Sequence, residues 1–579
     1  MTADASPAGT RRPIRRLDPQ TIERIAAGEV VERPASVVKE LLENALDAGA
    51  TEVRVTVARG GIDAIRVDDD GVGIPKEELP LALERHATSK LAGPDDLDAI
   101  ATLGFRGEAL AAIAAVARVT LTSRTRDADA AYALEAAGGA PGPVRAAARP
   151  PGTTVEAREL FFNTPARQKF LRSAAAEQVE VAATVERIHL ARPDVAIVLA
   201  TERGEIGRYV RALDLGDAAN RVFGPEFATG SFPVSGALPG GGRLEGVLGR
   251  PALARSHSTS LFVAVNRRAV ASRPIAQAVR AAFQDHLGRA RFPIGVLALI
   301  LPPGRVDPNA HPTKREVRFA DERALAESIR LLVRDALLGD APAAPPGPAG
   351  APAPPAPRPG PTASEGRGRQ RSFEGVAPPA SVAPSAHHPA LRLLGSIGRL
   401  YWVAERDDGA LLIDQHAASE RVLFDALLAH GRIGRQELLH PTVVLLSARE
   451  KAALEAHAEA VRAAGFDVAP FGGDRYRVRA VPSYLGRRLG AEALRPLLAE
   501  IADGGRPTVP DGLAERVAAS IACHAAVRAG DVVSPEEFGQ IVERLFARSE
   551  PAYACPHGRP IVVEVRRARL DRWFLRPTP

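Results

Sequence analysis

Cysteine is nearly absent from this sequence of 579 residues, which contains only Cys523 and Cys555. Two cysteines cannot form a disulfide framework, so disulfide-stabilised secreted domains are excluded, and a metal or redox role has to be weighed against inert burial. Long apolar runs are also missing. The longest, FPIGVLALIL at residues 292–301, is far shorter than the ~18 to 20 residues that a membrane-spanning helix needs, so it indicates a buried strand.

The first 20 residues, MTADASPAGTRRPIRRLDPQ, have basic residues but no apolar core. They do not resemble a secretory signal, so we expect a soluble cytoplasmic protein with no membrane association. The net charge of +6 favours an anionic partner without identifying one, because arginine-rich proteins with no nucleic-acid role carry a similar excess. Lysine is scarce, with six in the chain, and Lys39, Lys90 and Lys314 fall inside the motifs described below.

The length predicts roughly three or four domains, and one boundary is plain in the composition. Residues 338–390 consist mainly of Pro, Ala and Gly without apolar periodicity. Such a segment cannot repay the entropy of folding, so it is predicted to be a disordered linker between two folded halves. At ~3.1 Å per residue in polyproline form, its reach has an upper limit on the order of 150 Å.

The N-terminal half opens with a predicted helix, PASVVKELLENALDAGA at residues 34–50, with Pro near its start and Gly49 past its end. Glu40, Asn44 and Asp47 share one stripe of this helix. A solvated polar face would explain the stripe for a helix taken alone. A strand pair follows, and it leads to an acidic loop with the pattern D-x-G-x-G at Asp69, Gly71 and Gly73.

Three further glycine-rich or polar segments follow in order, RHATSKL (85–91), GFRGEALAAI (104–113) and PGTTVEA (151–157). Together with NTPARQKFL (163–171), this series resembles the nucleotide-binding domain of the MutL mismatch-repair family, which shares the GHKL superfamily with gyrase B, heat-shock chaperones and histidine kinases. No Gly-Lys dipeptide occurs, so a P-loop is excluded as the ATP site. A topoisomerase or chaperone ATPase is disfavoured by NTPARQKFL.

The resemblance implies an α+β protein that begins with a GHKL (Bergerat-type) α/β sandwich at residues 12–226 and binds ATP and Mg²⁺. It implies that Glu40 is the general base, that Asn44 ligates magnesium, and that Asp69 accepts a hydrogen bond from the adenine amino group. Glycines in GFRGE would let backbone N–H groups wrap the phosphates as a lid. The complete set of implied nucleotide contacts is Asn44, Asp69, Gly71, Gly73, Thr88, Ser89, Lys90, Gly104, Phe105, Arg106, Gly107, Glu108, Thr153 and Lys314.

A second α/β domain, the transducer, is expected at residues 227–337, with strands at LFVAVNRRAV and at residues 292–301. The family resemblance implies that Lys314, in HPTKREVRF, reaches the terminal phosphate from this neighbouring domain. An ordinary surface lysine is the alternative. Arg267 and Arg268 are candidate contacts to the DNA backbone, and a solvated face explains them equally well.

The C-terminal half, residues 391–579, places Asp414, His416 and Glu420 within DQHAASE after a strand-like run. Both cysteines lie beside histidines, in ACHAAVRAG and ACPHGRP. These segments resemble the endonuclease version of the MutL C-terminal domain. The chain departs from that pattern at Asp425, where the family has Glu, and at His524, where it usually has Lys or Arg.

The resemblance implies an α+β dimerisation and endonuclease domain that hydrolyses phosphodiesters with bound cations. Asp414 and Glu420 would position metal and water, and Arg559 would contact a DNA phosphate. The implied metal ligands are His416, Glu420, Cys523, Cys555 and His557. Zinc suits the Cys and His ligands, and manganese suits carboxylates. A structural zinc without cleavage is the alternative.

A regulatory insertion is expected at residues 440–515. It begins with RQELLHP, where Gln436, Leu438, Leu439 and Pro441 resemble the short motif that binds the sliding clamp in this family, although a loop-to-strand junction would look similar. The resulting hypothesis is a homodimeric, ATP-gated mismatch-repair protein that binds DNA and nicks it. Its implied partners are the mismatch-recognition protein MutS, the sliding clamp and a repair helicase. The alternative is a matchmaker without nuclease activity.

Overall fold

The computed structural model divides into two compact units, formed by Met1–Ala336 with Leu427–Ala525 and by Leu337–Ala426 with Ala526–Pro579. The structure describes residues 30–90, 103, 107–255, 258–284, 286–287, 291–307, 317–339, 391–406, 408–430, 434–484, 487–488, 490–502, 522, 526, 533–546, 554–555, 560–574 and 576. Nearly all of the predicted linker therefore lies outside the described residues. No helix within these ranges is long and apolar enough to cross a membrane.

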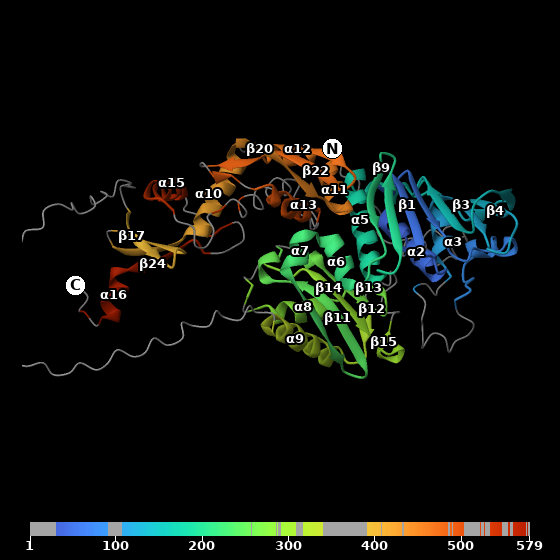
Figure 1. The fold of residues 1–579 in the computed structure, drawn as a ribbon, viewed down its shortest axis with the longest axis horizontal. Helices are drawn as coiled ribbons and strands as arrows, with labels where there is room; N and C mark the ends of the chain where they lie inside the picture. The colour runs from blue at the N-terminus through green and yellow to red at the C-terminus, as the bar shows by residue number, and fades with distance from the viewer. Residues whose placement is uncertain are drawn as a thin grey trace, which may run out of the picture. The chain divides into compact units, whose positions relative to one another are not determined.

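The first unit begins with a sheet whose strands follow the order β5-β4-β3-β7-β2-β1-β8-β9, with β6 paired to β4 (Figure 1). Its strands are β1 (Glu52–Ala58), β2 (Ala64–Asp69), β3 (Arg118–Arg124), β4 (Ala131–Ala137), β5 (Ala140–Pro141), β6 (Arg145–Ala147), β7 (Gly152–Arg158), β8 (Ala196–Thr201) and β9 (Gly204–Tyr209). Helices α2 (Pro34–Asp47), α3 (Ala109–Val116) and α5 (Ala174–Ala191) pack against it. The result is the predicted two-layer sandwich.

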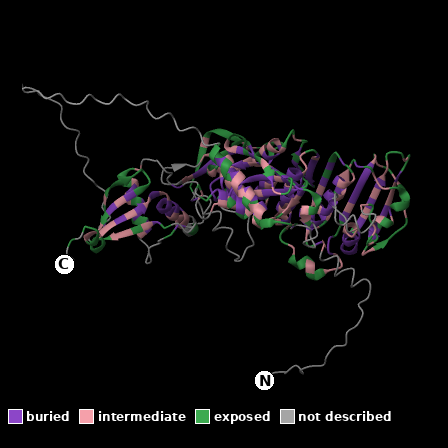
Figure 2. Cartoon of the chain, turned by 90° about the horizontal axis from the view of Figure 1, so that it is seen from below, coloured by how far each residue is buried: buried purple, intermediate pink, exposed green. Residues whose placement is uncertain are grey.

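Local sequence explains the elements that carry the predicted site. Helix α2 starts with Pro34 in its first turn, where a missing N–H costs nothing, and the chain leaves it at Gly49 with φ of 72°. In β1, Val53, Val55 and Val57 are buried while the residues between them are more exposed, as the period of a half-buried strand requires. Buried positions of the sheet and of its helices appear purple in Figure 2.

A second sheet in this unit has the order β10-β11-β14-β12-β13. The strands are β10 (Ser231–Leu238), β11 (Gly242–Gly249), β12 (Leu261–Val265), β13 (Arg268–Val270) and β14 (Gly295–Ile300), and the helices are α6 (Leu215–Phe223), α7 (Pro225–Gly230), α8 (Arg273–Ala282) and α9 (Glu322–Gly339). The apolar run at 292–301 is confirmed as a buried strand, because it contains β14. The run LFVAVNRRAV is a hairpin and not the single strand that we expected.

The reason for the hairpin lies in its two central residues. Asn266 and Arg267 have φ of 48° and 67°, the left-handed conformation that a tight two-residue turn requires. The side chain of Asn266 supports the turn, since it donates to the carbonyl of Leu301 and accepts from the Leu301 N–H.

The first unit also includes part of the C-terminal half. Strands β20 (Gly434–Leu445), β21 (Asp467–Gly472), β22 (Arg475–Tyr484) and β23 (Arg487–Arg488) form one sheet, in which β22 pairs with the other three. Helices α11 (Ala448–Ala456), α12 (Ala458–Ala463) and α13 (Leu494–Ala502) accompany this sheet. We call residues 434–502 the insertion module.

The second unit contains a separate antiparallel sheet of order β17-β18-β19-β24. It consists of β17 (Arg392–Ile397), β18 (Tyr401–Arg406), β19 (Gly409–Asp414) and β24 (Val562–Arg566), with helices α10 (Gln415–His430), α15 (Pro535–Phe546) and α16 (Arg567–Trp573). The ring of Trp402 meets that of Phe538 edge-on at 4.9 Å between centroids. This aromatic pair lies in a core shared by the sheet, α10 and α15.

Candidate functional site

The stripe on α2 points into protein and not into solvent. Glu40 is 7% exposed, and its carboxylate lies 3.1 Å from the ammonium of Lys39, which also lies 3.0 Å from a carboxylate oxygen of Glu43. Burial alone would lower the pKa of Lys39, but the two carboxylates outweigh it and hold that pKa above its ordinary value. On a solvated helix face Glu40 would be exposed to water. Its burial beside Lys39 therefore does not fit a solvated polar face at this position.

One lysine connects the far end of the same stripe to the segment RHATSKL. The Lys90 ammonium donates to the amide oxygen of Asn44 at 2.9 Å and to a carboxylate oxygen of Asp47 at 2.5 Å. The other oxygen of Asp47 accepts the backbone N–H of Leu103 at 2.9 Å. Asn44 and Asp47 thus hold two segments that are distant in sequence, and a positive charge already lies next to the Asn44 oxygen.

The loop after β2 is ordered by Asp69. Its carboxylate accepts the backbone N–H groups of Gly71 at 2.9 Å and Thr153 at 3.2 Å, and its backbone carbonyl accepts from Arg149 at 2.9 Å. Burial raises the pKa of Asp69, although these two backbone donors and the charge of Arg149 oppose the shift. Asp69 therefore lies in a partly desolvated position from which it can accept a further polar hydrogen.

Glycine is required in this loop by close approach of other backbone. A side-chain carbon at Gly73, where φ is 79°, would lie 2.2 Å from the carbonyl oxygen of Arg124, and one at Gly71 would lie 2.9 Å from the carbonyl oxygen of Ala48. The N–H of Val72 also donates to that Ala48 carbonyl at 3.1 Å. The loop consequently packs onto the C-terminal end of α2, one turn after Asn44.

The structure describes part of the predicted lid. The carbonyl of Gly107 accepts the N–H of His86 at 3.1 Å, and a side chain at Gly107, where φ is 62°, would meet the Ala87 carbonyl at 2.5 Å. Glu108 lies 3.4 Å from the His86 ring nitrogen. Thr88 and Ser89 are exposed, and Thr88 accepts the Lys90 N–H. Residues Gly104, Phe105 and Arg106 lie outside the described residues.

Thr153 is buried beside Asp69, and its hydroxyl lies 3.0 Å from the hydroxyl of Ser123. Ser123 of β3 also accepts the Ile74 N–H at 2.7 Å, so it joins β3 and β7 to the loop that follows β2. The sequence pattern did not identify Ser123 or Arg149. Their only signal was position, since each lies on or near a strand that flanks the loop.

The two arginines of the β12–β13 hairpin have different surroundings. Arg267 is exposed and lies 2.7 Å from the Asp194 carboxylate, whereas Arg268 is 6% exposed and donates to the Leu103 carbonyl at 2.5 Å. Arg192 and Arg267 hold the pKa of Asp194 at about 2, against the effect of burial. Arg268 connects the second sheet to the backbone position that Asp47 also holds. Lys314 lies outside the described residues.

In the second unit, the segment DQHAASE marks the start of a helix. Asp414 ends β19, and its carboxylate accepts the N–H of Ala417 at 2.9 Å, while its own N–H donates to the Ile561 carbonyl. Gln415 donates its side-chain amide to the Arg399 carbonyl. Asp414 therefore performs a capping function in addition to any role in chemistry.

The described candidate ligands are His416, Glu420 and Cys555. Glu420 is 1% exposed, and Cys555 is 4% exposed and lies in the same apolar cluster as Ala417 and Ala418 of α10. Cys523, His557 and Arg559 lie outside the described residues. Among the described residues, no three His, Cys, Asp or Glu side chains lie together as metal ligands.

Asp425, which stands where the family pattern has Glu, forms an ion pair with Arg421. Its carboxylate forms two contacts with the guanidinium of Arg421 one turn earlier, at 3.0 and 3.1 Å. The two side chains are 21% and 25% exposed, and this ion pair lies along α10.

The segment at 436–441 lies within strand β20, and its pairing with β22 is interrupted between Glu437 and Thr442. Leu439 is 90% exposed in this interruption, whereas Leu438 packs against the core of the insertion module. The expected loop-to-strand junction is thus an irregular stretch inside one strand. An exposed leucine on such a stretch can dock into an apolar pocket of a partner.

Comparison with known proteins gives a consistent assignment along the chain. Residues 32–137 match the family described as histidine kinase-, DNA gyrase B- and HSP90-like ATPase. Residues 219–338 match the DNA mismatch repair protein, C-terminal domain, and residues 394–533 match the MutL C terminal dimerisation domain.

Similarity to individual proteins extends over almost the full length. The chain is 41% identical over 574 residues to the DNA mismatch repair protein MutL of Desulforudis audaxviator, which covers 97% of this chain and 99% of that protein. It is 40% identical over 587 residues to MutL of Methanoculleus marisnigri, with the same shares covered. The chain belongs to the MutL family of DNA mismatch repair proteins. The predicted fold class is confirmed, since this MutL protein has a GHKL-type ATPase domain and a C-terminal dimerisation domain in a mixed α and β structure.

Proposed function

We propose that this MutL protein hydrolyses ATP with Glu40 as the general base and uses the cycle to control DNA repair. The observation that supports the proposal is the packing of the Asp69–Gly73 loop onto the end of α2, one turn from Asn44 and two from Glu40. In this arrangement the Asp69 carboxylate receives the adenine amino group. Glu40, buried beside Lys39, orients the attacking water and takes its proton.

The donor set suits a magnesium ion. Asn44 offers an amide oxygen, a hard ligand of the kind that Mg²⁺ accepts together with phosphate and water. That oxygen lies against the Lys90 ammonium here, so a cation is already tolerated next to it. The ion would neutralise charge on the phosphates. In the same site Lys90 would turn from Asp47 toward phosphate when Asn44 is engaged, while the other oxygen of Asp47 would keep the Leu103 N–H.

The remaining ATP contacts complete the site. Thr88, Ser89 and the segment from Gly104 to Glu108 contribute donors to the phosphates, with Gly107 providing the left-handed turn. Thr153 supports the adenine side through its contact with Asp69. Lys314 reaches the terminal phosphate from the transducer domain, where its charge is attracted only while that phosphate is present.

For the C-terminal half we propose metal-dependent nicking of duplex DNA. Asp414 and Glu420 position the metal and water, and His416, Cys523, Cys555 and His557 act as ligands for manganese or zinc. Arg559 contacts the DNA phosphate. Buried Glu420 and buried Cys555 support this assignment, because both belong to the unit built around α10.

A second function is favoured by one specific observation. Asp425 has a shorter side chain than the Glu of the nuclease pattern and pairs with Arg421, which would weaken its support of a metal site. In the alternative, the C-terminal metal is purely structural, and the protein acts as an ATP-dependent matchmaker that recruits other repair factors.

The partners we propose are DNA, MutS, the sliding clamp and a repair helicase, with the protein acting as a homodimer through its dimerisation domain. Arg267 is the exposed candidate for DNA contact, and Arg268 would act by holding the hairpin in place. Gln436, Leu438, Leu439 and Pro441 form the proposed clamp contact. Exposed Leu439 is its anchor.

The two functions are separated by nicking of supercoiled plasmid with manganese, comparing the unmodified chain with Asp414→Asn, in the presence of clamp and ATP. Loss of nicking in the variant supports the nuclease. Absence of nicking by both proteins favours the matchmaker. Glu40→Ala tests the ATPase separately. It should bind ATP but not hydrolyse it, and unchanged turnover would remove Glu40 from the proposed role.

A further inference from the structure

The ATPase sheet ends in a strand that another part of the chain covers. Strand β9 pairs only with β8 among the described strands, so its outer side is an edge. Helix α11 of the insertion module packs against β9 and against α5, although residues 204–209 and 448–456 are far apart in sequence. An uncovered edge strand invites unwanted pairing, and α11 covers this one.

The contact exchanges side chains between two apolar cores. Ala448 at the start of α11 is 2% exposed and belongs to the core of the ATPase domain. Val179 of α5 is 9% exposed and belongs to the core of the insertion module. The ATPase domain and the insertion module therefore each contribute a side chain to the core of the other. Such packing is typical of an apolar interface and not of a contact between polar surfaces.

Gly207 on β9 permits the close approach. A side-chain carbon built there would lie 2.6 Å from the methyl carbon of Ala448, a distance that atoms cannot share. The backbone of Gly207 is outside the left-handed region, so its own conformation does not require glycine. A larger side chain does not fit at position 207, because Ala448 occupies the space that its Cβ would take.

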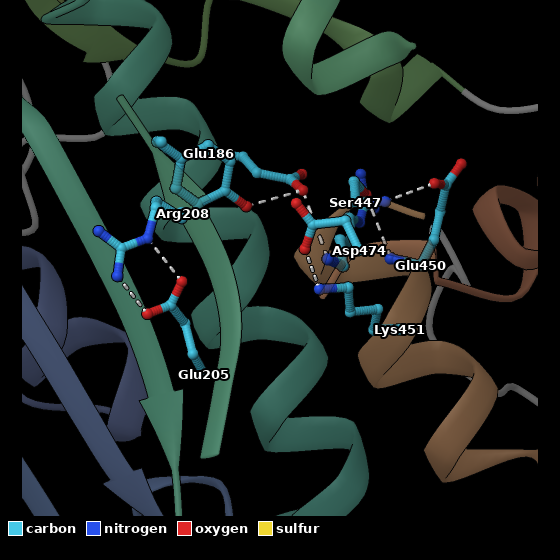
Figure 3. A network of polar contacts seen from close by, with 9 residues as sticks. Glu186, Glu205, Arg208, Ser447, Glu450, Lys451 and Asp474 are labelled. Carbon is cyan, nitrogen blue, oxygen red and sulfur yellow. Dashed lines mark hydrogen bonds and ion pairs between the residues drawn. The ribbon is translucent and has the colours of Figure 1, made fainter. Parts of the chain in front are cut away.

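A buried carboxylate lies at the centre of the contact. Glu186 of α5, labelled in Figure 3, is 2% exposed. It accepts the Tyr209 hydroxyl at 3.2 Å and the Arg449 N–H at 3.4 Å. At the rim, the Gln178 amide lies 3.5 Å from the Glu455 carboxylate. A group as costly to bury as Glu186 is satisfied here by donors from both sides.

The insertion module presents α11 rigidly. Ser447 and Glu450 form a reciprocal cap at the start of the helix, and Glu450 also pairs with Arg495 of α13 at 3.2 Å, both side chains being buried. Lys451 pairs with Asp474 in the turn between β21 and β22 (Figure 3). The helix thus reaches the ATPase domain already fixed to its own sheet and to α13.

We propose that residues 434–502 are a docking module whose receptor is the α5 and β9 face of the ATPase domain of the same chain. Helix α5 packs along α2, the helix that carries Glu40 and Asn44. Docking therefore fixes the helix behind the ATP site. Since coupling between sites is reciprocal, occupancy of the ATP site and docking of the module influence each other.

Cysteine cross-linking tests the contact without nucleotide or DNA, so its result does not depend on ATP hydrolysis or nicking. Gln178→Cys and Glu455→Cys are introduced together in the full chain and treated at low concentration with a short bis-maleimide, because the native contact joins the tips of two long side chains and a direct disulfide needs closer Cβ atoms. We expect a cross-link within one chain, seen as altered mobility at monomer mass. The single variants, which retain Cys523 and Cys555, control for native thiols. A product found only at dimer mass, or none, would overturn the proposal.

Gly207→Ala in the cross-linking background tests the fit. Overpacking by one methyl costs roughly 1–3 kcal/mol, which corresponds to a loss of about fivefold to 150-fold in docking. Ala448→Gly added to Gly207→Ala should restore the cross-link, because it removes the clashing methyl. The matched control is Gly304→Ala, where the added carbon meets nothing within 4 Å. Equal cross-linking in Gly207→Ala and Gly304→Ala would show that the close approach does not exist.

Discussion

The ammonium nitrogen of Lys90 lies 2.5 Å from a carboxylate oxygen of Asp47, and the two side chains are 20% and 7% exposed. Asp47 also holds the Leu103 N–H, and Lys90 also donates to Asn44. This pair therefore fixes the chain at Lys90 and at Leu103, the residue directly before the predicted lid at 104–108. The pair is largely buried, in the region of the proposed ATP site.

The first prediction concerns the strength of this pair. We expect Asp47→Asn and Lys90→Met each to lower the free energy of unfolding, with a coupling energy of about 1 kcal/mol or more between them, because exposed pairs give only ~0.2–1 kcal/mol. Urea unfolding of the two single variants and the double variant measures it. Arg59→Met with Asp63→Asn serves as the exposed comparison, with side chains 64% and 50% exposed. A Lys90–Asp47 coupling no larger than that of the exposed pair would contradict the prediction.

The second prediction separates backbone strain from close approach at the nucleotide loop. Gly73→Ala and Gly49→Ala both place a side chain at positive φ, which costs roughly 1–2 kcal/mol. Only the Gly73 variant also meets backbone, at 2.2 Å, while nothing lies within 4 Å at Gly49. We therefore expect Gly73→Ala to lose nucleotide affinity by more than about tenfold and Gly49→Ala to retain it, as measured by calorimetric titration with a non-hydrolysable ATP analogue. Similar affinities would remove Gly73 from the site.

The local motifs could be predicted because their chemistry follows from spacing. Glu40, Asn44 and Asp47 share a helix face at fixed intervals, and Asp69 through Gly73 form one continuous loop. The apolar strand at 292–301 was found for the same reason. The hairpin at Asn266 and Arg267 was missed, since an Asn-Arg turn lacks the glycine that usually marks a two-residue connection.

The docking contact could not be predicted from one sequence. Glu186 and Arg449 are separated by 263 positions, and neither has a neighbouring residue whose spacing suggests the other. Glu186 lies in an alanine-rich helix, so the sequence alone predicts a solvent-exposed side chain. In the structure Glu186 is buried and contacts α11. The same applies to Arg268, whose partner Leu103 is also held by Asp47 of α2. Long-range polar contacts of this kind depend on tertiary packing, which no local pattern encodes.

The third prediction uses buried His189 on α5. Burial lowers its pKa to about 4, so the folded chain keeps it neutral while the unfolded chain protonates it near pH 6.5. As pH falls from 6.5 toward 4, the unfolded state gains protons and stability is lost, by up to about 3 kcal/mol. Urea unfolding at pH 7.5 and pH 5 should show this loss, and His189→Leu should reduce it. An unchanged pH dependence in the variant would mean that His189 does not cause the loss.

The fourth prediction concerns Glu186, whose pKa burial raises to about 7. Around it, Glu450 of α11 adds to the rise, while the charge and N–H of Arg449 and the Ser447 hydroxyl oppose it, and Tyr209 of β9 donates to it. The docked state thus prefers protonated Glu186, whereas in an undocked chain its pKa would be near the ordinary ~4.5. Docking should therefore be fully favoured below pH 4.5 and should weaken as pH rises through 7.

The expected change in docking affinity follows from the pKa of Glu186 in the docked and undocked chains. With these two values, docking is about tenfold weaker at pH 8 than at pH 6. The measurement is the yield of the Gln178→Cys, Glu455→Cys cross-link at both pH values, divided by the yield in the same background with Glu186→Gln. Thiol reactivity changes equally in the two proteins and cancels in the ratio, and His189 is present in both. Glutamine keeps the shape of the protonated acid and cannot ionise, so its docking stays constant across this range. A ratio that is the same at pH 6 and pH 8 would show that Glu186 is not desolvated by α11, and the contact would then lack its central buried carboxylate.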